Sequence, residues 1–254
     1  MLKKEKIEKE LINLGVIPPK IVFYEQTDST NTRAKEYARE NPDNHETVVF
    51  IADGQTGGRG RLGRSFVSNK GAGIYVSILT YPTECGFDAT ASTARAAVDV
   101  AEAIESLCDC RIGIKWVNDL YLDGKKLAGI LTEGEMTSEG KITYQVVGMG
   151  INVYKNAISN EISDIATSIE SEKIAPPDRS SLVARIIKNQ LTDRDGITAK
   201  YKARSVIIGR AVTVVKASES YTATVLDVNP DFSLKIKTVR GIEDLFSGEV
   251  SLKI

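Results

Sequence analysis

The chain has 254 residues, 33 of them basic and 34 acidic, so its formal net charge at neutral pH is −1. This length fits one large domain, or a large domain with a smaller one, and the apolar fraction of 42% is ordinary for a globular protein. A protein whose main task is to hold nucleic acid usually has a basic excess, and no apolar run approaches the ~20 residues that span a bilayer. Composition therefore speaks against a nucleic-acid binder and against a membrane protein.

The N-terminus and the cysteines indicate the cellular compartment. Residues 1–10 are charged and lack the apolar core of a secretory signal. The three cysteines, Cys85, Cys108 and Cys110, are an odd number without the spacing of a disulfide framework. A zinc site at Cys108 and Cys110 is disfavoured because His45 is the only histidine and no second cysteine pair exists. We therefore expect reduced thiols and a cytoplasmic protein.

Helical and strand-like patterns alternate through the first four fifths of the chain. Residues 1–15 are predicted to form a short helix because apolar side chains recur at spacings of four and three, at Ile7, Leu11 and Leu14. Strands are expected at residues 21–24, 47–52, 74–80, 111–122, 125–133 and 144–153. Further helices are expected at residues 28–40, at residues 90–108, and through residues 182–191 after a cap at Asp178 or Ser180.

After about Ser205 the pattern changes. Strand-like runs at residues 211–216, 221–228, 232–238 and 249–253 are separated by turn signals, and no helical period appears. Short strands with regular turns predict a small β-barrel. We therefore expect an α+β protein with a short N-terminal helix in residues 1–20, a main domain in residues 21–204 and a small all-β domain in residues 205–254.

Residues 57–64 read Gly-Gly-Arg-Gly-Arg-Leu-Gly-Arg and follow a predicted strand. The glycines give up backbone entropy, and their missing side chains let backbone N–H groups approach a ligand closely. The arginines add planar, permanently charged forks that suit carboxylates and phosphates. The segment matches neither a Walker A motif nor the dinucleotide fingerprint. It is predicted to bind an anion, and a solvated loop or a nucleic-acid-binding Arg-Gly-Gly segment is the alternative.

Asp123-Gly124, between two runs of alternating apolar residues, predicts a two-residue β-hairpin. The expected pairs are Leu122 with Lys125, Tyr121 with Lys126 and Asp119 with Ala128. If the strand is regular, one polar face gathers Lys115, Asp119, Tyr121 and Lys126, while Leu120, Leu122 and Leu127 face a core. A purely structural hairpin with a solvated polar face would show the same alternation, and a slip of one residue would break the prediction.

A polar turn, Asp-Ser-Thr-Asn at residues 28–31, opens the second predicted helix. Capping of the helix would explain Ser29, Thr30 and Asn31 without any ligand. A hydroxyl-rich helix start also suits a neutral ligand with carbonyl and N–H groups, such as a ureido ring. Both interpretations stay open at this point.

Five motifs, in this order, resemble those of the biotin protein ligases. They are residues 28–31, Gln55 ahead of residues 58–64, Lys-Trp-Val-Asn-Asp-Leu at residues 115–120, Lys-Leu-Ala-Gly-Ile-Leu at residues 126–131, and Gly-Met-Gly-Ile-Asn at residues 148–152. The similarity covers about residues 21–254. The glycine-arginine loop combined with Lys-Trp-x-Asn-Asp is far more specific than either motif alone.

The resemblance implies a catalytic α+β domain with a mixed sheet and packed helices, similar to class II synthetases and lipoate ligases, and a C-terminal SH3-like barrel. It implies an enzyme that uses ATP to form biotinyl-5'-AMP and then transfers biotin to a lysine of a biotin carboxyl carrier domain of a carboxylase. Since only about 20 residues precede the catalytic domain, the monofunctional type without an N-terminal helix-turn-helix domain is implied.

The resemblance also implies roles for individual residues. Lys126, Arg61 and Asp119 are the catalytic candidates, with Asp119 either taking a proton from the acceptor lysine or orienting it. The biotin-binding candidates are Ser29, Thr30, Asn31, Gln55, Gly58, Arg59, Arg61, Lys126, Gly129 and Gly150. The ATP-binding candidates are Arg61, Arg64, Phe66, Lys115, Asn118 and Asn152. Mg²⁺ is expected through the ATP phosphates rather than at a protein metal site.

The chain departs from the family pattern at three places. Ser65-Phe66 stands where members often have Lys-Trp, and Val117 replaces a common proline. Residues 164–169 stand where some members place a tryptophan over adenine, so nucleotide stacking is expected to be weaker or to come from another residue.

Two other functions compete with biotin ligation. A lipoate or octanoate ligase would use the same chemistry on another acyl group, although Gln55 and the loop favour biotin. A biotin-sensing regulator would bind nucleic acid, which the near-neutral charge and the missing helix-turn-helix disfavour. A homodimer is compatible with the resemblance because family members include dimers built on the catalytic sheet.

Overall fold

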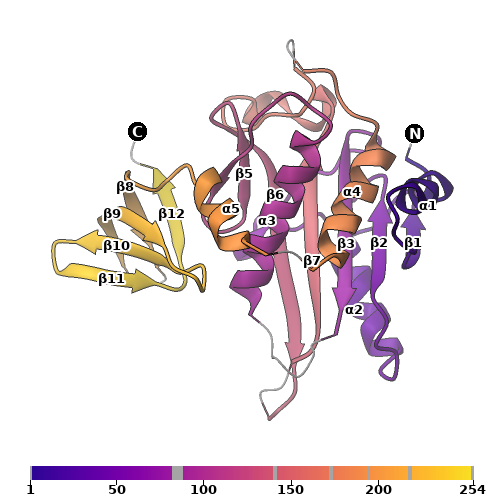
Figure 1. Cartoon of the computed structure of the whole chain (residues 1–254), viewed down its shortest axis with the longest axis horizontal. Helices are drawn as coiled ribbons and strands as arrows, with labels where there is room; N and C mark the ends of the chain where they lie inside the picture. Colours follow the sequence, from indigo (N-terminus) through magenta and orange to yellow (C-terminus); the bar gives the residue numbers. More distant parts are fainter. Residues whose placement is uncertain are drawn as a thin grey trace.

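The structure is a computed structural model that describes residues 2–81, 88–139, 142–171, 174–193, 195–216 and 219–252. Within these residues a seven-stranded sheet has the strand order β1-β2-β3-β7-β6-β5-β4, and a second, five-stranded sheet has the order β11-β10-β9-β8-β12 (Figure 1). β1 and β2 run parallel, whereas the other neighbours are antiparallel. This mixed sheet with helices and a separate antiparallel sheet confirms the predicted α+β class.

The elements of the large sheet and its helices have the following bounds. The strands are β1 (Lys20–Tyr24), β2 (Val48–Ala52), β3 (Gly73–Thr80), β4 (Gly113–Lys115), β5 (Asp119–Leu122), β6 (Lys125–Met136) and β7 (Ile142–Asn152). The helices are α1 (Lys4–Asn13), α2 (Thr30–Glu40), α3 (Ala89–Glu105), α4 (Arg179–Leu191) and α5 (Ile197–Arg204). Single 3-10 turns occur at η1 (Arg61–Gly63), η2 (Lys155–Ala157) and η3 (Asn160–Ile162). The C-terminal strands are β8 (Ala211–Val215), β9 (Ser220–Val228), β10 (Leu234–Thr238), β11 (Gly241–Leu245) and β12 (Glu249–Leu252).

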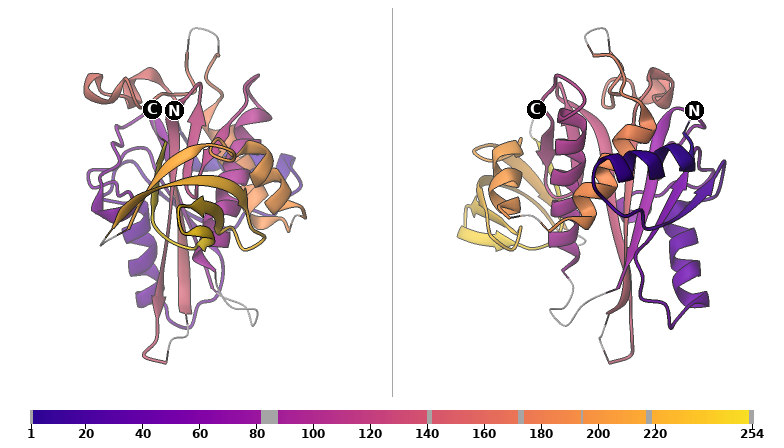
Figure 2. Two further views of the ribbon diagram at one scale, coloured as in Figure 1. Left: turned by 90° about the vertical axis from the view of Figure 1, so that its left-hand side faces the viewer. Right: turned by 45° about the vertical axis from the view of Figure 1, so that its right-hand side comes forward.

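Both faces of the large sheet are covered by helices. Successive side chains of a strand point to opposite faces, and on β2 Val49 and Ile51 join the cluster that includes α1, α3 and α4. Val48 and Phe50 instead pack with Ala34 of α2. Figures 1 and 2 show α1 crossing α4, with α3 and α4 side by side on one face of the sheet. Strands β2 and β3 are therefore buried on both of their faces.

The N-terminal helix is packed on the main body. Ile7 and Leu11 have no exposed surface and belong to the core cluster, and Lys6 Nζ donates a hydrogen bond of 2.8 Å to Asp178 at the start of α4. Gly15, at φ 76°, ends the segment in a conformation that glycine adopts readily.

The expected strand at residues 111–122 is wrong. The chain forms β4, turns at residues 116–118 and returns as β5, so that β4 and β5 are themselves a hairpin. Contacts with the C-terminal part explain the turn: Trp116 Nε1 donates to the carbonyl oxygen of Phe232 at 2.7 Å, and the Tyr201 hydroxyl donates to the carbonyl oxygen of Val117 at 3.2 Å. Periodicity within the segment does not contain this information.

The register of the Asp123-Gly124 hairpin was predicted correctly near the turn and incorrectly further away. Tyr121 pairs with Lys126 and Leu122 with Lys125, as expected. Asp119 lies opposite Gly129, not Ala128, because the pairing shifts by one residue between Leu120 and Tyr121. Such a β-bulge adds one unpaired residue to a strand.

Two elements were not predicted. β11 was missed because four of its five residues are exposed, so the burial pattern does not alternate, and Gly241 was interpreted as part of a turn. α5 is short, and Tyr201 is its one buried residue, which gives a weak helical pattern. The predicted boundary between residues 204 and 205 stays a prediction, as does that at residue 20, because buried residues from α1 to β12 form one contiguous cluster.

Two of the three cysteines, Cys108 and Cys110, lie among the described residues. Among the described residues no group of three or more His, Cys, Asp or Glu side chains could hold a metal ion. Cys108 and Cys110 are free thiols, and burial raises the pKa of Cys110 to about 11. Cys85 lies outside the described residues. None of the described helices has the length and apolarity required to cross a bilayer.

Leu11→Ala should lower the free energy of unfolding by about 2–5 kcal/mol because it removes a fully buried side chain between α1 and the core. Ile12→Ala, at a neighbouring position that is 63% exposed, is the matched control and should change it by less than ~0.5 kcal/mol. Chemical denaturation monitors both. Equal effects of the two substitutions would show that α1 is not docked in this way.

Candidate active site

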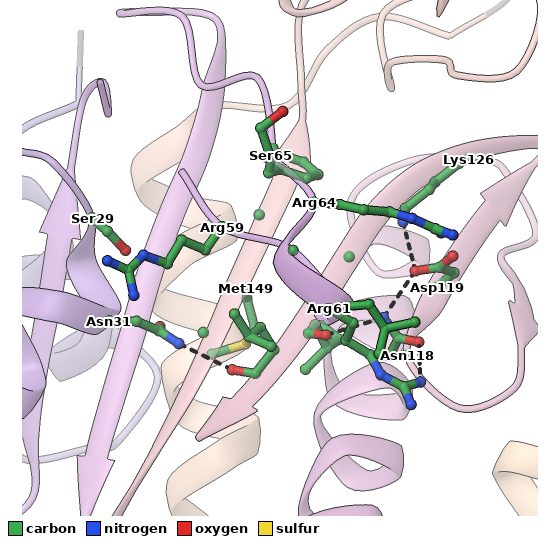
Figure 3. Close-up of a pocket in the computed structure, with 18 of the residues that line it drawn as sticks. Ser29, Asn31, Arg59, Arg61, Arg64, Ser65, Asn118, Asp119, Lys126 and Met149 are labelled. Atoms are coloured by element: carbon green, nitrogen blue, oxygen red, sulfur yellow. Dashed lines mark hydrogen bonds and ion pairs between the residues drawn. The ribbon is translucent and has the colours of Figure 1, made fainter. Parts of the chain in front are cut away.

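One pocket collects almost all the residues that the sequence singled out (Figure 3). It lies between the start of α2, the loop that joins β2 to β3, and strands β4 to β7. The predicted residues that line it are Ser29, Thr30, Asn31, Gln55, Arg59, Arg61, Arg64, Phe66, Lys115, Asn118, Asp119, Lys126, Gly129 and Gly150. Two predicted residues, Gly58 and Asn152, are not among the lining residues.

Gly58 and Asn152 act behind the pocket wall. A Cβ atom on Gly58 would overlap the Phe66 carbonyl oxygen and the Ser68 hydroxyl, so glycine lets the two arms of the loop approach each other. Asn152 is 6% exposed, and its Nδ2 donates to the carbonyl oxygen of Thr167 at 3.1 Å. It therefore supports the segment that lies beside the pocket.

The glycine-arginine loop has a fixed stem and a projecting tip. Backbone hydrogen bonds from Gln55 to Ser68 and from Phe66 to Gly58 join its two arms. The tip turns through η1, where Leu62 has φ 56° and is 76% exposed. The stem thus fixes where the tip emerges, and the tip presents its arginines to the pocket.

The N-terminus of α2 is capped by a residue that is distant in the sequence. Thr30 N donates to Gln55 Oε1 at 2.8 Å, while the Ser29 backbone N–H is bound by the Asp28 carboxylate at 2.7 Å. The Ser29 side chain makes no capping hydrogen bond, and it points toward the pocket in Figure 3. Capping by Ser29 therefore does not explain the serine, and its hydroxyl can meet a ligand.

A chain of hydrogen bonds fixes the orientation of Gln55. Its Oε1 accepts from the backbone and the hydroxyl of Thr30, at 2.8 and 3.1 Å, while its Nε2 donates to the Ser68 hydroxyl at 3.0 Å. The hydroxyl oxygen of fully buried Ser77 lies 2.7 Å from Thr30 Oγ1, at hydrogen-bond distance. Since Oε1 is turned to Thr30, the remaining amide hydrogen of Gln55 is a donor for a ligand carbonyl group.

Asn31 contacts the protein rather than offering polar atoms to a ligand. Its Oδ1 accepts from Ser77 at 2.6 Å, and its Nδ2 donates to Glu133 Oε2 at 2.8 Å and to the Leu131 carbonyl oxygen at 3.2 Å. A Cβ atom on Gly148 would overlap the Asn31 side chain, so glycine is required opposite it. Asn31 thereby shapes the wall beside Ser29 and Thr30.

Glu133 joins this polar network and was not predicted as a site residue. Lys35 Nζ lies 2.6 Å from its Oε1, and the two side chains are 18% and 25% exposed. Burial alone would raise the pKa of Glu133, but the hydrogen bonds from Lys35 and Asn31 outweigh it and hold the pKa below the ordinary value of 4.5. The carboxylate therefore stays ionised beneath the neutral end of the pocket.

The opposite end of the pocket carries a connected set of charged groups. Lys126 Nζ lies 2.7 Å from Asp119 Oδ1, which also accepts from Asn118 Nδ2 at 3.0 Å. Arg61 Nη1 in turn donates to Asn118 Oδ1 at 3.0 Å. Figure 3 shows this chain of contacts from Lys126 to Arg61. The loop tip and the β5–β6 hairpin are therefore linked through the turn at residues 116–118.

The charge balance of the pocket favours an anion. The described lining residues include five cationic side chains, Arg59, Arg61, Arg64, Lys115 and Lys126, and one carboxylate, Asp119.

The backbone of residues 165–167 holds Lys126 in place. The Lys126 backbone N–H donates to the Ile165 carbonyl oxygen at 2.9 Å, and the Lys126 carbonyl oxygen accepts from the Thr167 backbone N–H at 2.8 Å.

A phenyl ring and two glycines shape the space between the two ends. A Cβ atom on Gly150 would lie 2.8 Å from Phe66 Cε1, and one on Gly129 would lie 3.8 Å from Phe66 Cε2. Larger side chains at Gly150 would displace the ring. The pocket thus has one end lined by neutral hydrogen-bonding side chains, with Arg59 beside them, a narrow middle and a cationic end around Lys126 and Arg61.

Other lining residues were not predicted. They are Leu62, Ser65, Trp116, Ile130, Leu131, Gly148, Met149 and Val250, whereas Gly60 lines the pocket as part of the predicted glycine-arginine loop. Most lie within or next to the motifs described in the sequence, so including every residue of each motif would have identified them. Val250 comes from β12 of the C-terminal sheet, and no local signal connects it to the pocket.

Comparisons with known proteins agree with this geometry. Residues 23–152 match the model of the Biotin/lipoate A/B protein ligase family. The chain is 30% identical to the biotin–[acetyl-CoA-carboxylase] ligase of Mycobacterium tuberculosis, over 84% of this chain and 81% of that protein. It is 28% identical to the bifunctional ligase/repressor BirA of Bacillus subtilis, over 98% of this chain and 80% of that protein.

A solved structure, the biotin protein ligase from Aquifex aeolicus in complex with biotin and ATP, superposes with a TM-score of 0.76 at 28% identity. The superposition covers 92% of this chain and 98% of that chain. The chain therefore belongs to the biotin/lipoate A/B protein ligase family. Within that family it is a biotin protein ligase, and it is an enzyme.

Ser77→Ala should raise the KM for biotin by about tenfold, because Thr30 and Asn31 lose a buried hydrogen-bond partner whose removal costs ~1–3 kcal/mol. The KM for ATP should stay unchanged. The matched control is Thr93→Val, which removes a hydroxyl contact of 2.7 Å with Thr132 on the opposite face of the sheet. Steady-state kinetics with each substrate varied would check this, and an equal change in both KM values would contradict it.

We expect Glu133 to contribute to the loss of folding stability at acid pH. Its pKa is lowered in the folded state, so its stabilising contribution is complete above the ordinary value of 4.5 and is lost as the pH falls through the folded pKa. Glu133→Gln should therefore destabilise the protein near neutral pH and lose that difference progressively below pH 4.5. Urea denaturation across this range measures it; a difference that does not depend on pH would refute the assignment.

Proposed function

We propose that this chain uses ATP to convert biotin to biotinyl-5'-AMP and then transfers biotin to a lysine of a biotin carboxyl carrier domain. The observation that carries this proposal is the unlike character of the two ends of the pocket. Biotin has a neutral ureido ring at one end and a carboxylate at the other, which matches the network around Gln55 and the cationic set around Lys126.

The ureido ring would lie at the neutral end. Its carbonyl oxygen would accept from Gln55 or from the Ser29 hydroxyl, and its N–H groups would meet the hydroxyl oxygens there. Arg59 lies beside Ser29 and Asn31 in Figure 3, so it would move as the ring enters and then cover the ligand. The acyl chain would run past Phe66 between the two glycine-bearing strands.

In the first step an oxygen of the biotin carboxylate attacks the α-phosphorus of ATP, and pyrophosphate leaves. Both reactants are anions, so catalysis requires fixed cations where their oxygens approach. Lys126 would bridge the carboxylate and the α-phosphate, while Arg61 and Arg64 would bind phosphate oxygens. Lys115 and Asn118 are further candidates for nucleotide contacts.

In the second step the ε-amine of the acceptor lysine attacks the carbonyl carbon of the mixed anhydride, and AMP leaves. The amine must lose a proton, and Asp119 is the carboxylate nearest to Lys126. Its Oδ1 is bound by Lys126 and Asn118, whereas no described residue hydrogen-bonds Oδ2. Asp119 would therefore orient the amine through Oδ2 and accept its proton there.

Mg²⁺ enters this proposal only with the nucleotide. Asp119 is the single carboxylate among the described lining residues, and it is paired with Lys126. This donor set does not fit an ion that prefers several oxygen ligands at octahedral positions. We therefore assign Mg²⁺ to the ATP phosphates and derive no step through it.

Other expectations stay predictions. They are the carboxylase that supplies the carrier domain, the monofunctional type, a homodimer, the absence of nucleic-acid binding and the cytoplasmic location. The SH3-like character of the C-terminal sheet is also part of the proposal, and five antiparallel strands support it.

Exchange of label between pyrophosphate and ATP, measured with each carboxylic acid substrate in turn, tests the function. We expect exchange with biotin and not with lipoate or octanoate, followed by labelling of a carrier domain. Exchange driven by lipoate or octanoate would make the protein a lipoate-type ligase. Absence of exchange together with DNA binding at moderate salt would indicate a regulator.

Lys126→Ala should slow adenylate formation by ~10²–10³-fold, the effect of losing one aligned charge-stabilising group. Lys125→Ala is the matched control, because Lys125 is the adjacent residue of the same strand and its Nζ contacts the Ser163 carbonyl oxygen on the surface. Single-turnover formation of biotinyl-AMP measures both. Near-normal synthesis by Lys126→Ala would remove this lysine from the mechanism.

A further inference from the structure

A buried ion pair lies outside the pocket and is not used by the chemistry above. Arg179, at the start of α4, is 6% exposed, and its Nη1 lies 2.8 Å from Asp53 Oδ1. The same nitrogen donates to the Gly73 carbonyl oxygen at 2.9 Å. The guanidinium carbon is also 5.8 Å from the centre of the Tyr154 ring.

The two partners of Arg179 mark the two ends of the glycine-arginine loop. Asp53 directly follows β2, and Gly73 is the first residue of β3. The loop between them carries Gln55 and Arg59, together with Arg61, Arg64 and Phe66. One guanidinium group therefore joins both points at which the loop leaves the sheet.

Further contacts attach neighbouring segments to the same place. Gly71 N donates to the Asp53 carbonyl oxygen at 2.9 Å, and Tyr154 N donates to the Ala72 carbonyl oxygen at 2.9 Å. A Cβ atom on Gly73 would lie 2.7 Å from the Tyr75 hydroxyl, so little space surrounds the carbonyl group that Arg179 binds. Small changes at this point are transmitted to the loop because tightly packed interiors do not deform freely.

Stability alone does not account for a buried ion pair. Removing two charges from water is costly, and apolar side chains of similar volume often replace such a pair without loss of stability. The position of this pair, between the two loop stems and with side chains only 6% and 9% exposed, instead indicates a geometric role.

We propose that Arg179 is a positioning residue that sets the separation of the loop stems and thereby keeps Arg59 and Arg61 over the bound adenylate. This inference rests on the proposed function. Arg179 is not among the residues that line the pocket, so its loss should affect how long the adenylate is retained more than how fast it forms.

The test uses the double variant Asp53→Leu with Arg179→Met, which replaces the ion pair by apolar side chains. We expect biotinyl-AMP to leave this variant at least about tenfold faster than the wild type, since small displacements of groups that hold a reactant have effects of this size or larger. The rate of adenylate formation at saturating biotin and ATP should differ from that of the wild type by less than about threefold. Preformed adenylate is followed by rapid gel filtration, and labelling of a bystander protein without a carrier domain reports escape into solution.

Two further variants separate positioning from general loosening. Ile187→Ala removes a fully buried side chain of α4 that lies outside the stem contacts, and it should lower the melting temperature without changing adenylate release. Arg179→Lys keeps the charge but has a shorter side chain and lacks the planar guanidinium group that lies over the Tyr154 ring. It should show faster release, and it replaces the double variant if that protein does not fold.

The outcomes are distinct. Faster release from the arginine variants but not from Ile187→Ala supports the proposal. Unchanged release from a folded arginine variant, or equal acceleration by Ile187→Ala, overturns it while leaving the ligase activity in place. A wild-type protein that forms no adenylate would contradict the proposed function instead.

Discussion

The repulsion between a carboxylate and a polyphosphate is the constraint around which this pocket is organised. The ion pair between Lys126 and Asp119 is the contact that meets it, because it holds the lysine ammonium group beside Asn118 and Arg61 at the cationic end of the pocket. A fixed cation needs no reorganisation when negative charge approaches, and this is where preorganised sites gain most. Asn118 connects the ion pair to Arg61, so the loop tip and the hairpin are held in one arrangement.

The rest of the fold maintains that arrangement from several directions. The C-terminal part anchors the turn that carries Asn118 and Asp119, through the bonds from Trp116 to Phe232 and from Tyr201 to Val117. On the other side, the network from Ser77 through Thr30 to Gln55 makes one end of the pocket neutral and directional. The chain thus separates recognition of an uncharged ring from stabilisation of charge, and each end rests on its own part of the structure.

The sequence predicted the pocket residues better than the elements that present them. Motif residues such as Gln55, Arg61 and Lys126 were identified because their chemistry is visible in the sequence, and the pocket does bring them together. The strand at residues 111–122 was wrong because the Trp116 N–H bonds to a carbonyl 116 residues away. Ser77 was missed because a serine inside an apolar strand shows no local signal for the α2 residues above it.

A crystal structure with biotin and a non-hydrolysable ATP analogue tests the central claim most directly. The account predicts Lys126 Nζ within about 3.5 Å of both a biotin carboxylate oxygen and an α-phosphate oxygen, with Arg59 moved over the ligand and the ureido ring beside Gln55. A complex in which Lys126 touches neither substrate, while Arg59 stays beside Asn31, would contradict it.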